Sequence, residues 1–206
     1  MRITVIGGNS GTGAERVRLA AERGHDVTCF SRSGAKDLPV GALDVRGDAL
    51  DHAAVKQAID GADAVVVTVG GAKGSSRHRA KVTRSVIRAM RDAGVRRLIV
   101  QSSLGAGDSG ALMALPGRLI AKTVLAAPLA DHNDQEAAVF ASGLDWTVVR
   151  PGGLNDKPAT GAVVAQETAE GRAMKAMISR ADVAEYIVSI LDDATTHGKA
   201  LGLGTG

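Results

Sequence analysis

The chain has 206 residues, of which 45% are hydrophobic and 23% are charged. This composition can bury a core, which excludes a disordered chain and predicts one domain over residues 1–206. The 25 basic and 22 acidic residues nearly balance, and the aromatic side chains are two Phe, one Tyr and one Trp, so no nucleic-acid partner is expected. The single cysteine, Cys29, excludes an internal disulfide and a cysteine-clustered metal site.

Neither an export signal nor a membrane span is expected. The apolar run before the first glycines covers only residues 3–6, and a secretory signal needs a longer one. The most hydrophobic stretch, residues 111–130, contains two prolines and two basic residues, which a membrane helix tolerates poorly. We therefore expect a cytoplasmic protein without membrane association, acting as a monomer or homodimer.

Short runs rich in β-branched residues alternate with longer stretches of helical period. The expected strands are Arg2–Ile6, Asp26–Phe30, Ala42–Val45, Ala64–Val69, Arg97–Gln101, Trp146–Val149 and Gly161–Val164. The expected helices are Ala14–Arg23, Asp51–Ile59, one with the apolar stripe Val82, Val86, Ile87 and Met90, Asp131–Ala141, and one starting near Asp182 with the stripe Val183, Ile187, Ile190 and Leu191. This order predicts an α/β protein with a Rossmann-like, doubly wound parallel sheet flanked by helices in three layers.

A glycine-rich loop, residues 7–13, lies between the first strand and the first helix. In its GxxxGxG spacing Gly7 suits a tight turn, Gly11 a close approach to phosphate, and Gly13 close packing of helix on strand. The free N–H groups and the dipole at the helix start would stabilise a pyrophosphate. We expect this loop to bind a dinucleotide, and the alternative is a tight turn that binds nothing. The candidate residues are Gly7, Asn9, Ser10, Gly11, Thr12 and Gly13.

Basic residues follow the second strand. After its last residue, Phe30, the chain continues Ser31-Arg32-Ser33, Lys36 is close behind, and the first carboxylate is Asp37. An acidic residue at this place would hold the ribose 2′-hydroxyl of NADH, whereas an arginine suits the 2′-phosphate of NADPH. We therefore expect NADPH to be preferred over NADH. The alternative is a solvated basic loop.

Further motifs follow the later strands in a consistent order. They are Val45-Arg46-Gly47-Asp48-Ala49, Thr68-Val69-Gly70-Gly71, Gln101-Ser102-Ser103-Leu104-Gly105, Val149-Arg150-Pro151-Gly152-Gly153 and Ile178-Ser179-Arg180-Ala181-Asp182-Val183-Ala184. With the glycine loop, this series resembles the atypical, NAD(P)H-binding group of the short-chain dehydrogenase/reductase superfamily. That group includes the NmrA-like proteins and the biliverdin reductase B, or flavin reductase, type.

The resemblance implies roles for residues at the strand ends. It implies that Asp48 and Ala49 contact the adenine, that Val69 and Gly70 flank the nicotinamide-side ribose, and that the serine pair lies beside the nicotinamide. The cofactor-binding candidates of this kind are Asp48, Ala49, Val69, Gly70, Ser102 and Pro151. The alternatives are a helix cap for Asp48 and a solvated turn for the serines.

Two departures from the family pattern stand out. In the GxxGxxG register common to atypical members, Ser10 replaces the middle glycine. The catalytic short-chain enzymes use a tyrosine four residues before a lysine, but Ile190 lies four residues after the only tyrosine, Tyr186. We therefore expect poor interconversion of alcohols and ketones, because no positioned acid serves the carbonyl oxygen.

Hydride transfer to a flavin or quinone needs mainly orientation, which the remaining residues can supply. The catalytic candidates are Ser102, Ser103 and His132. His132 is proposed as the acid because the flavin reductase type has a histidine at the corresponding place and an unperturbed pKa of ~6.5 suits proton exchange. Alternatively, Asp131 or Asn133 simply caps a helix there.

The other histidines and basic residues have less specific patterns. No pair of histidines has a metal-binding helix spacing, so no metal is expected, and the remaining four are expected at the surface: His25, His52, His78 and His197. The segment Arg77-His78-Arg79 is either a solvated basic loop or reaches a phosphate or an anionic substrate. Apolar side chains after the fifth strand are suited to an acceptor pocket, a subunit contact or ordinary packing, namely Leu112, Leu115, Leu119, Val124 and Leu125.

The leading hypothesis is an NAD(P)H-dependent oxidoreductase, using NADPH, that passes hydride to a flavin, quinone or similar small conjugated acceptor. The alternative is a non-catalytic NADP(H)-binding redox sensor of the NmrA type. A sensor should lack an acceptor pocket and should not oxidise NADPH. A third class, isomerases and epimerases of nucleotide sugars, is weakened because these enzymes also usually require the tyrosine.

Overall fold

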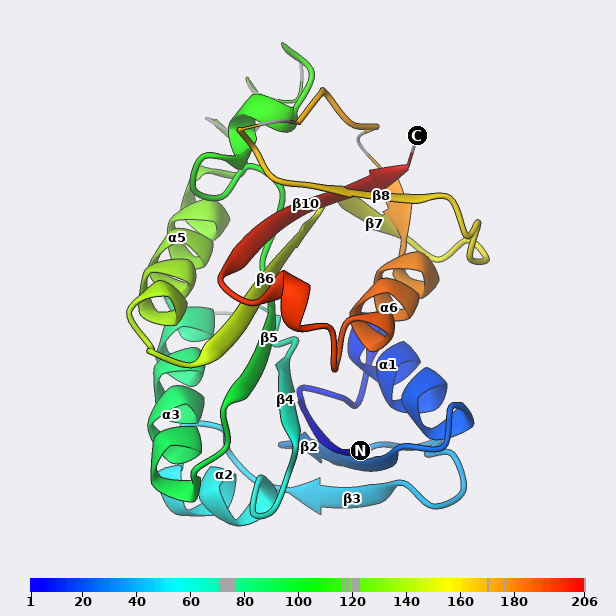
Figure 1. Cartoon of the computed structure of the whole chain (residues 1–206), viewed down its shortest axis with the longest axis vertical. Helices are drawn as coiled ribbons and strands as arrows, with labels where there is room; N and C mark the ends of the chain where they lie inside the picture. Colours follow the sequence, from blue (N-terminus) through cyan, green and yellow to red (C-terminus); the bar gives the residue numbers. More distant parts are fainter. Residues whose placement is uncertain are drawn as a thin grey trace.

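The computed structural model describes residues 1–70, 77–115, 117, 119, 123–169, 171–175 and 177–205. Its main feature is an eight-stranded sheet in the order β3-β2-β1-β4-β5-β6-β10-β8 (Figure 1). These strands are β1 Arg2–Ile6, β2 Asp26–Ser31, β3 Leu43–Arg46, β4 Ala64–Val67, β5 Arg97–Gln101, β6 Asp145–Pro151, β8 Val163–Gln166 and β10 Lys199–Thr205. All neighbours pair in parallel except β8, which is antiparallel to β10.

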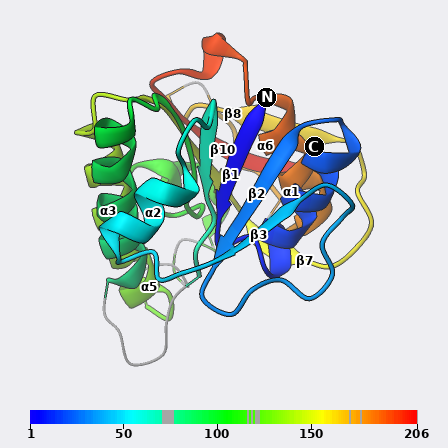
Figure 2. The ribbon, with the colours of Figure 1, turned by 90° about the horizontal axis from the view of Figure 1, so that it is seen from below.

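Helices cover both faces of the sheet (Figure 2). On one face lie α1, Gly11–Glu22, and α6, Arg180–Ser189, which contact each other; on the other lie α2, His52–Ala58, α3, His78–Ala93, and α5, Ala126–Phe140. Smaller elements are the paired strands β7, Gly153–Asn155, and β9, Met177–Ser179, and the short helices η1, Ser109–Leu112, and η2, Ala194–Thr196. The expected three-layer, doubly wound Rossmann-like fold is confirmed.

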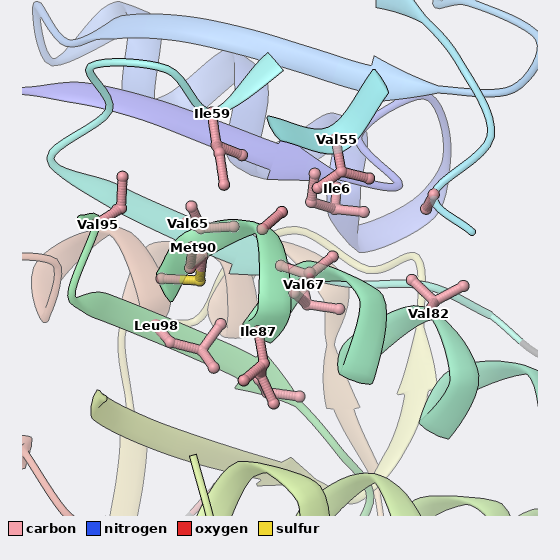
Figure 3. Close-up of a cluster of buried hydrophobic side chains, with 14 of the residues drawn as sticks. Ile6, Val55, Ile59, Val65, Val67, Val82, Ile87, Met90, Val95 and Leu98 are labelled. Carbon is pink, nitrogen blue, oxygen red and sulfur yellow. The ribbon is translucent and has the colours of Figure 1, made fainter. Parts of the chain in front are cut away.

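Each face of the sheet has its own hydrophobic core. Along β4, Val65 and Val67 point into the cluster under α2 and α3 (Figure 3), whereas Ala64 and Val66 belong to the cluster under α1 and α6. All four residues of β4 are buried, as expected for a central parallel strand that is covered on both sides. The two stripes expected on α3 and at α6 lie in these clusters, which confirms both periodicities.

Strand β10 and the start of helix α5 are the main differences from the sequence expectation. Strand β10 was not expected, because Gly202 and Gly204 lower its apparent strand propensity. A Cβ at Gly202 would collide with Leu112, and one at Gly204 would collide with Met174, so packing favours glycine at both positions. Helix α5 starts at Ala126 rather than Asp131, with Pro128 in its first turn, where a proline is tolerated.

Among the described residues, no helix is both long and apolar enough to cross a membrane.

Candidate cofactor and active site

A groove runs across the carboxyl ends of the parallel strands, where open α/β sheets bind ligands. It consists of two cavities, of about 230 Å³ and about 470 Å³, which we call the first and the second cavity. Both are lined by Ser10, Thr68, Val69 and Gly70, so they adjoin at the glycine loop and the end of β4. The volume of the second cavity lies within the usual range for small-molecule sites.

The glycine loop has the geometry of an anion-binding turn. Gly7 has a φ of +85°, and a Cβ on Gly13 would overlap the Gly7 carbonyl oxygen, so α1 approaches the strand end closely. The amides of Gly13 and Ala14 donate to the Ser10 carbonyl. No hydrogen bond in the described structure uses the amides of Gly11 and Thr12, which remain available for a phosphate.

Arg180 lies across this loop, at the start of α6. A Cβ built on Gly11 would lie 3.6 Å from its Nε, and the side chain lines the second cavity. Its Nη1 donates to the exposed Asp156 carboxylate over 2.7 Å. Sequence reasoning placed Arg180 in a family motif but gave it no ligand. The available signal was the basic residue at the first position of the last helix.

The first cavity gathers most of the residues expected around the adenosine half. Its lining includes Gly7, Asn9, Ser10, Arg32, Ser33, Asp48, Ala49, Val69 and Gly70. Asn9 Nδ2 donates to Ser33 Oγ over 2.9 Å, which ties the glycine loop to the loop after β2. Arg32 is exposed and makes no ion pair or hydrogen bond within the described residues. Its guanidinium can therefore bind a phosphate without breaking an existing interaction.

Some expected residues lie elsewhere. Lys36 lines a separate third cavity behind the glycine loop, together with Gly8 and Ala14, and does not line the first cavity. The cap of α2 is Asp51, which accepts from the amide of Ala53 over 2.9 Å, and not Asp48. Gly71 of the fourth-strand motif lies outside the described residues.

His78 corrects the expectation of a surface histidine. It is buried at the start of α3 and lines the first cavity beside Val69 and Val82. The next residue, Arg79, lines the second cavity, whereas Arg77 forms a surface ion pair with Asp134. The segment is therefore not simply a solvated loop, because two of its three side chains face the groove.

The three catalytic candidates Ser102, Ser103 and His132 line the second cavity, and so does the cofactor-binding candidate Pro151. Ser102 Oγ lies 3.4 Å from His132 Nδ1, which is also 3.2 Å from Gln135 Oε1. Burial, and then the charge of Arg79, lower the pKa of His132 to about 4. The ring is therefore neutral at neutral pH, in contrast to the ordinary pKa assumed from the sequence. With its proton on Nδ1 facing the amide oxygen, the ring leaves Nε2 as an acceptor.

Asp131 caps a helix other than its own. Its Oδ1 accepts from the Ala80 amide and its Oδ2 from the Arg79 amide, each over 3.1 Å, at the start of α3. Oδ2 also pairs with Arg79 Nη1 at 3.3 Å. Burial raises the pKa of Asp131, but the bonds from Ala80 and Arg79 outweigh it, so the net shift is downward. Asp131 therefore joins α5 to α3 and holds Arg79 at the second cavity. The interpretation of Asp131 or Asn133 as the cap of their own helix is wrong.

The charge lining the second cavity is positive. Among the described residues that line it, Arg79 and Arg180 are cationic and none is acidic. No group of three or more potential metal ligands occurs in the described part of the chain. The buried Arg150 makes two ion pairs: Nη2 contacts the buried Glu136 at 2.8 Å, and Nη1 contacts the exposed Asp108 at 2.6 Å. These pairs link β6 and α5 to the loop that follows Ser102 and Ser103.

The free amides of Gly11 and Thr12, the tight turn at Gly7 and the adjoining cavity together define a dinucleotide-binding Rossmann protein. A family model described as NAD(P)H-binding matches residues 7–194. The chain therefore belongs to this NAD(P)H-binding family, which confirms the resemblance to the atypical short-chain dehydrogenase/reductases.

Individual relatives are similar over nearly the whole chain. The uncharacterized sugar epimerase YhfK of Bacillus subtilis (strain 168) is 27% identical over an alignment of 220 residues, which covers 100% of this chain and 95% of that protein. The anaerobillin reductase ChuY of Escherichia coli O157:H7 superposes with a TM-score of 0.81 and 25% identity, over 100% of this chain and 97% of that one. A short-chain dehydrogenase/reductase of Veillonella parvula in complex with NADP gives a TM-score of 0.85 at 18% identity, over 98% and 94% of the two chains, and shows the fold alone.

Proposed function

We propose that this protein is an NADPH-dependent reductase that passes hydride to a flavin, a quinone or a similar conjugated acceptor. The observation that carries the proposal is the second cavity, which adjoins the glycine loop and is lined by Ser102, Ser103 and His132. A protein that only senses the cofactor needs room there for the nicotinamide but no room for an acceptor beside it. The similarity to a protein described as an anaerobillin reductase supports a reductase.

The described residues fit a dinucleotide along the groove. The loop from Gly7 to Gly13, with the free amides of Gly11 and Thr12, would hold the pyrophosphate, and Arg180 would add a charge from α6. Arg32 and Ser33 would bind the 2′-phosphate, with Asp48 and Ala49 at the adenine. When bound, NADPH supplies the hydride. Its preference over NADH rests on the unpaired guanidinium of Arg32.

The side chains of the second cavity favour an acceptor that needs little acid catalysis. Tyr186 lies half-buried on α6 and lines neither cavity of the groove, so no tyrosine serves a substrate oxygen there. Neutral His132, whose Nδ1 lies 3.4 Å from the Ser102 hydroxyl, does not deliver a proton as an imidazolium. Conjugated acceptors fit this site because their reduced forms can take the proton from solvent. Orientation of the acceptor is then the main contribution of the protein.

The test is NADPH oxidation by the purified protein with menadione and, separately, with FMN as acceptor. The proposal predicts turnover with at least one of them. Ser102→Ala should lower kcat about 10-fold or more if the hydroxyl lies at the reacting ring. The matched control, Ser189→Ala, alters an exposed serine of α6 and should leave kcat unchanged. NADPH binding without oxidation by any acceptor would contradict the proposal and favour the sensor.

A further inference from the structure

Arg16 is a buried cation without an acidic partner. It lies on α1 one turn after Thr12, is 1% exposed, and makes a hydrogen bond from Nη2 to Gln101 Oε1 at the end of β5. Its Nε and Nη1 are buried and have no partner, and no ion pair within the described residues includes it. Burial lowers the pKa of Arg16 to about 9, so the guanidinium is still charged at neutral pH. A buried unpaired charge costs stability, and such costs are typical of functional sites.

The guanidinium fixes the orientation of the Gln101 amide. A guanidinium has only donors, so it is the oxygen of the Gln101 side chain, and not the nitrogen, that faces Arg16. The Thr68 hydroxyl donates to the same oxygen over 3.5 Å. Turning the amide round would place its N–H groups against those of Arg16. The amide nitrogen is therefore held on the side away from Arg16.

Gln101 lines the second cavity, between Thr68 and Ser102. The side chain is half-buried, and within the described residues its Nε2 makes no hydrogen bond. Nε2 is also absent from the polar atoms that are sealed from solvent without a partner. Its N–H groups are therefore open to the cavity.

We propose that Gln101 donates a hydrogen bond to an oxygen of the acceptor bound in the second cavity, and that Arg16 is the positioning residue that holds it. This inference rests on the proposed function and names the ligand chemistry, a carbonyl of a conjugated ring such as a quinone. When hydride adds to such a ring, negative charge develops on the carbonyl oxygen. A fixed amide backed by a buried cation stabilises that charge, and solvent then supplies the proton.

Kinetics of matched variants test the proposal, with menadione as acceptor and saturating NADPH. Gln101→Leu removes the donor and should lower kcat about 100-fold. Gln101→Glu has nearly the same shape and pairs with Arg16, so it should fold well yet lose as much activity. Gln57→Leu, on the exposed side of α2, is the control and should behave as wild type. The Kd for NADPH should stay within about threefold in every variant, because the donor serves the acceptor.

Arg16 is tested through coupling to Gln101. Arg16→Met should lower kcat in the wild-type background. It should cause no further loss in Gln101→Leu, because Arg16 acts on the acceptor only through the Gln101 side chain. Arg16→Lys should restore part of the activity, since a single ammonium donor can still face the amide oxygen. A merely structural role for Arg16 predicts additive losses instead, and additive losses would overturn the positioning role.

A second readout does not depend on turnover. The Gln101 side-chain amide is identified in proton–nitrogen correlation spectra by its loss in Gln101→Leu, and menadione is then titrated into the protein saturated with NADP⁺. A shift of this resonance supports the donor, even if no acceptor is ever reduced and the proposed function fails. An unchanged resonance at saturating menadione overturns the inference. Turnover with unchanged kcat in the Gln101 variants also overturns it, while leaving the proposed function intact.

Discussion

At the scale of single residues, three buried basic side chains differ in how their charge is accommodated. Arg97 is buried but donates to the carbonyls of Ile190 and Leu191 and to the Thr147 and Thr196 hydroxyls, so it closes the end of α6. Arg16 has a single acceptor and lies beneath the groove. His132 is uncharged at neutral pH, because burial lowers its pKa to about 4. His132 lines the second cavity and Arg16 contacts Gln101, which lines it too, so both of these buried groups lie at the candidate site, where such costs are usually found.

His132 predicts a pH dependence of stability. Its pKa is about 4 in the folded protein and ~6.5 in an unfolded chain, so the unfolded state binds the extra proton first as the pH falls. The free energy of unfolding should therefore fall between about pH 6.5 and pH 4, by roughly 3 kcal/mol from this group. Urea unfolding at a series of pH values measures this. His132→Gln should flatten the profile in that window, and an equal slope in both proteins would contradict the burial of a neutral ring.

At the scale of elements, helix ends are fixed by contacts that are distant in sequence. Asp131 is 51 residues from the Ala80 amide that it accepts from, so the cap of α3 is supplied by α5. Local spacing instead predicted that Asp131 starts its own helix. Ser179 and Asp182 are a contrasting case, because the serine accepts from the Asp182 amide over 2.9 Å within one turn. Such a local cap can be predicted from sequence, and the start of this helix was placed only a few residues late.

The Asp131 cap predicts a stability effect. Asp131→Ala leaves the first amides of α3 without an acceptor and should lower the free energy of unfolding by about 1–2 kcal/mol. The matched control is Asp134→Ala, three residues further along α5, which removes only a surface pair with Arg77 and should cost less than about 1 kcal/mol. Chemical denaturation measures both. Equal losses would show that the bond between α5 and α3 adds nothing beyond a surface contact.

At the scale of the whole molecule, the sheet order brings separate strand ends to one groove. The alternation of strands and helices predicted the fold, and the residues following each strand predicted much of the groove lining, from Ser10 to Ser102. Strand β10 could not be predicted from the sequence, because its glycines lower the strand propensity and are explained only by the side chains packed against them. Arg16 and Gln101 are 85 residues apart and meet only in the folded chain, where the long Arg16 side chain reaches from α1 to the end of β5. Pairs of this kind depend on tertiary packing, which local sequence patterns do not encode.

Thermal unfolding with NADPH and, separately, with NADH tests whether this groove binds NADPH. A ligand at a hundredfold its Kd adds ~2.7 kcal/mol to stability, which raises the Tm of a domain this size by roughly 5 to 10 °C. We expect this rise with NADPH, a smaller one with NADH, and loss of the difference in Arg32→Ala but not in the control Arg88→Ala, an exposed arginine of α3. An unchanged Tm with both nucleotides at high excess would show that the groove does not bind the cofactor.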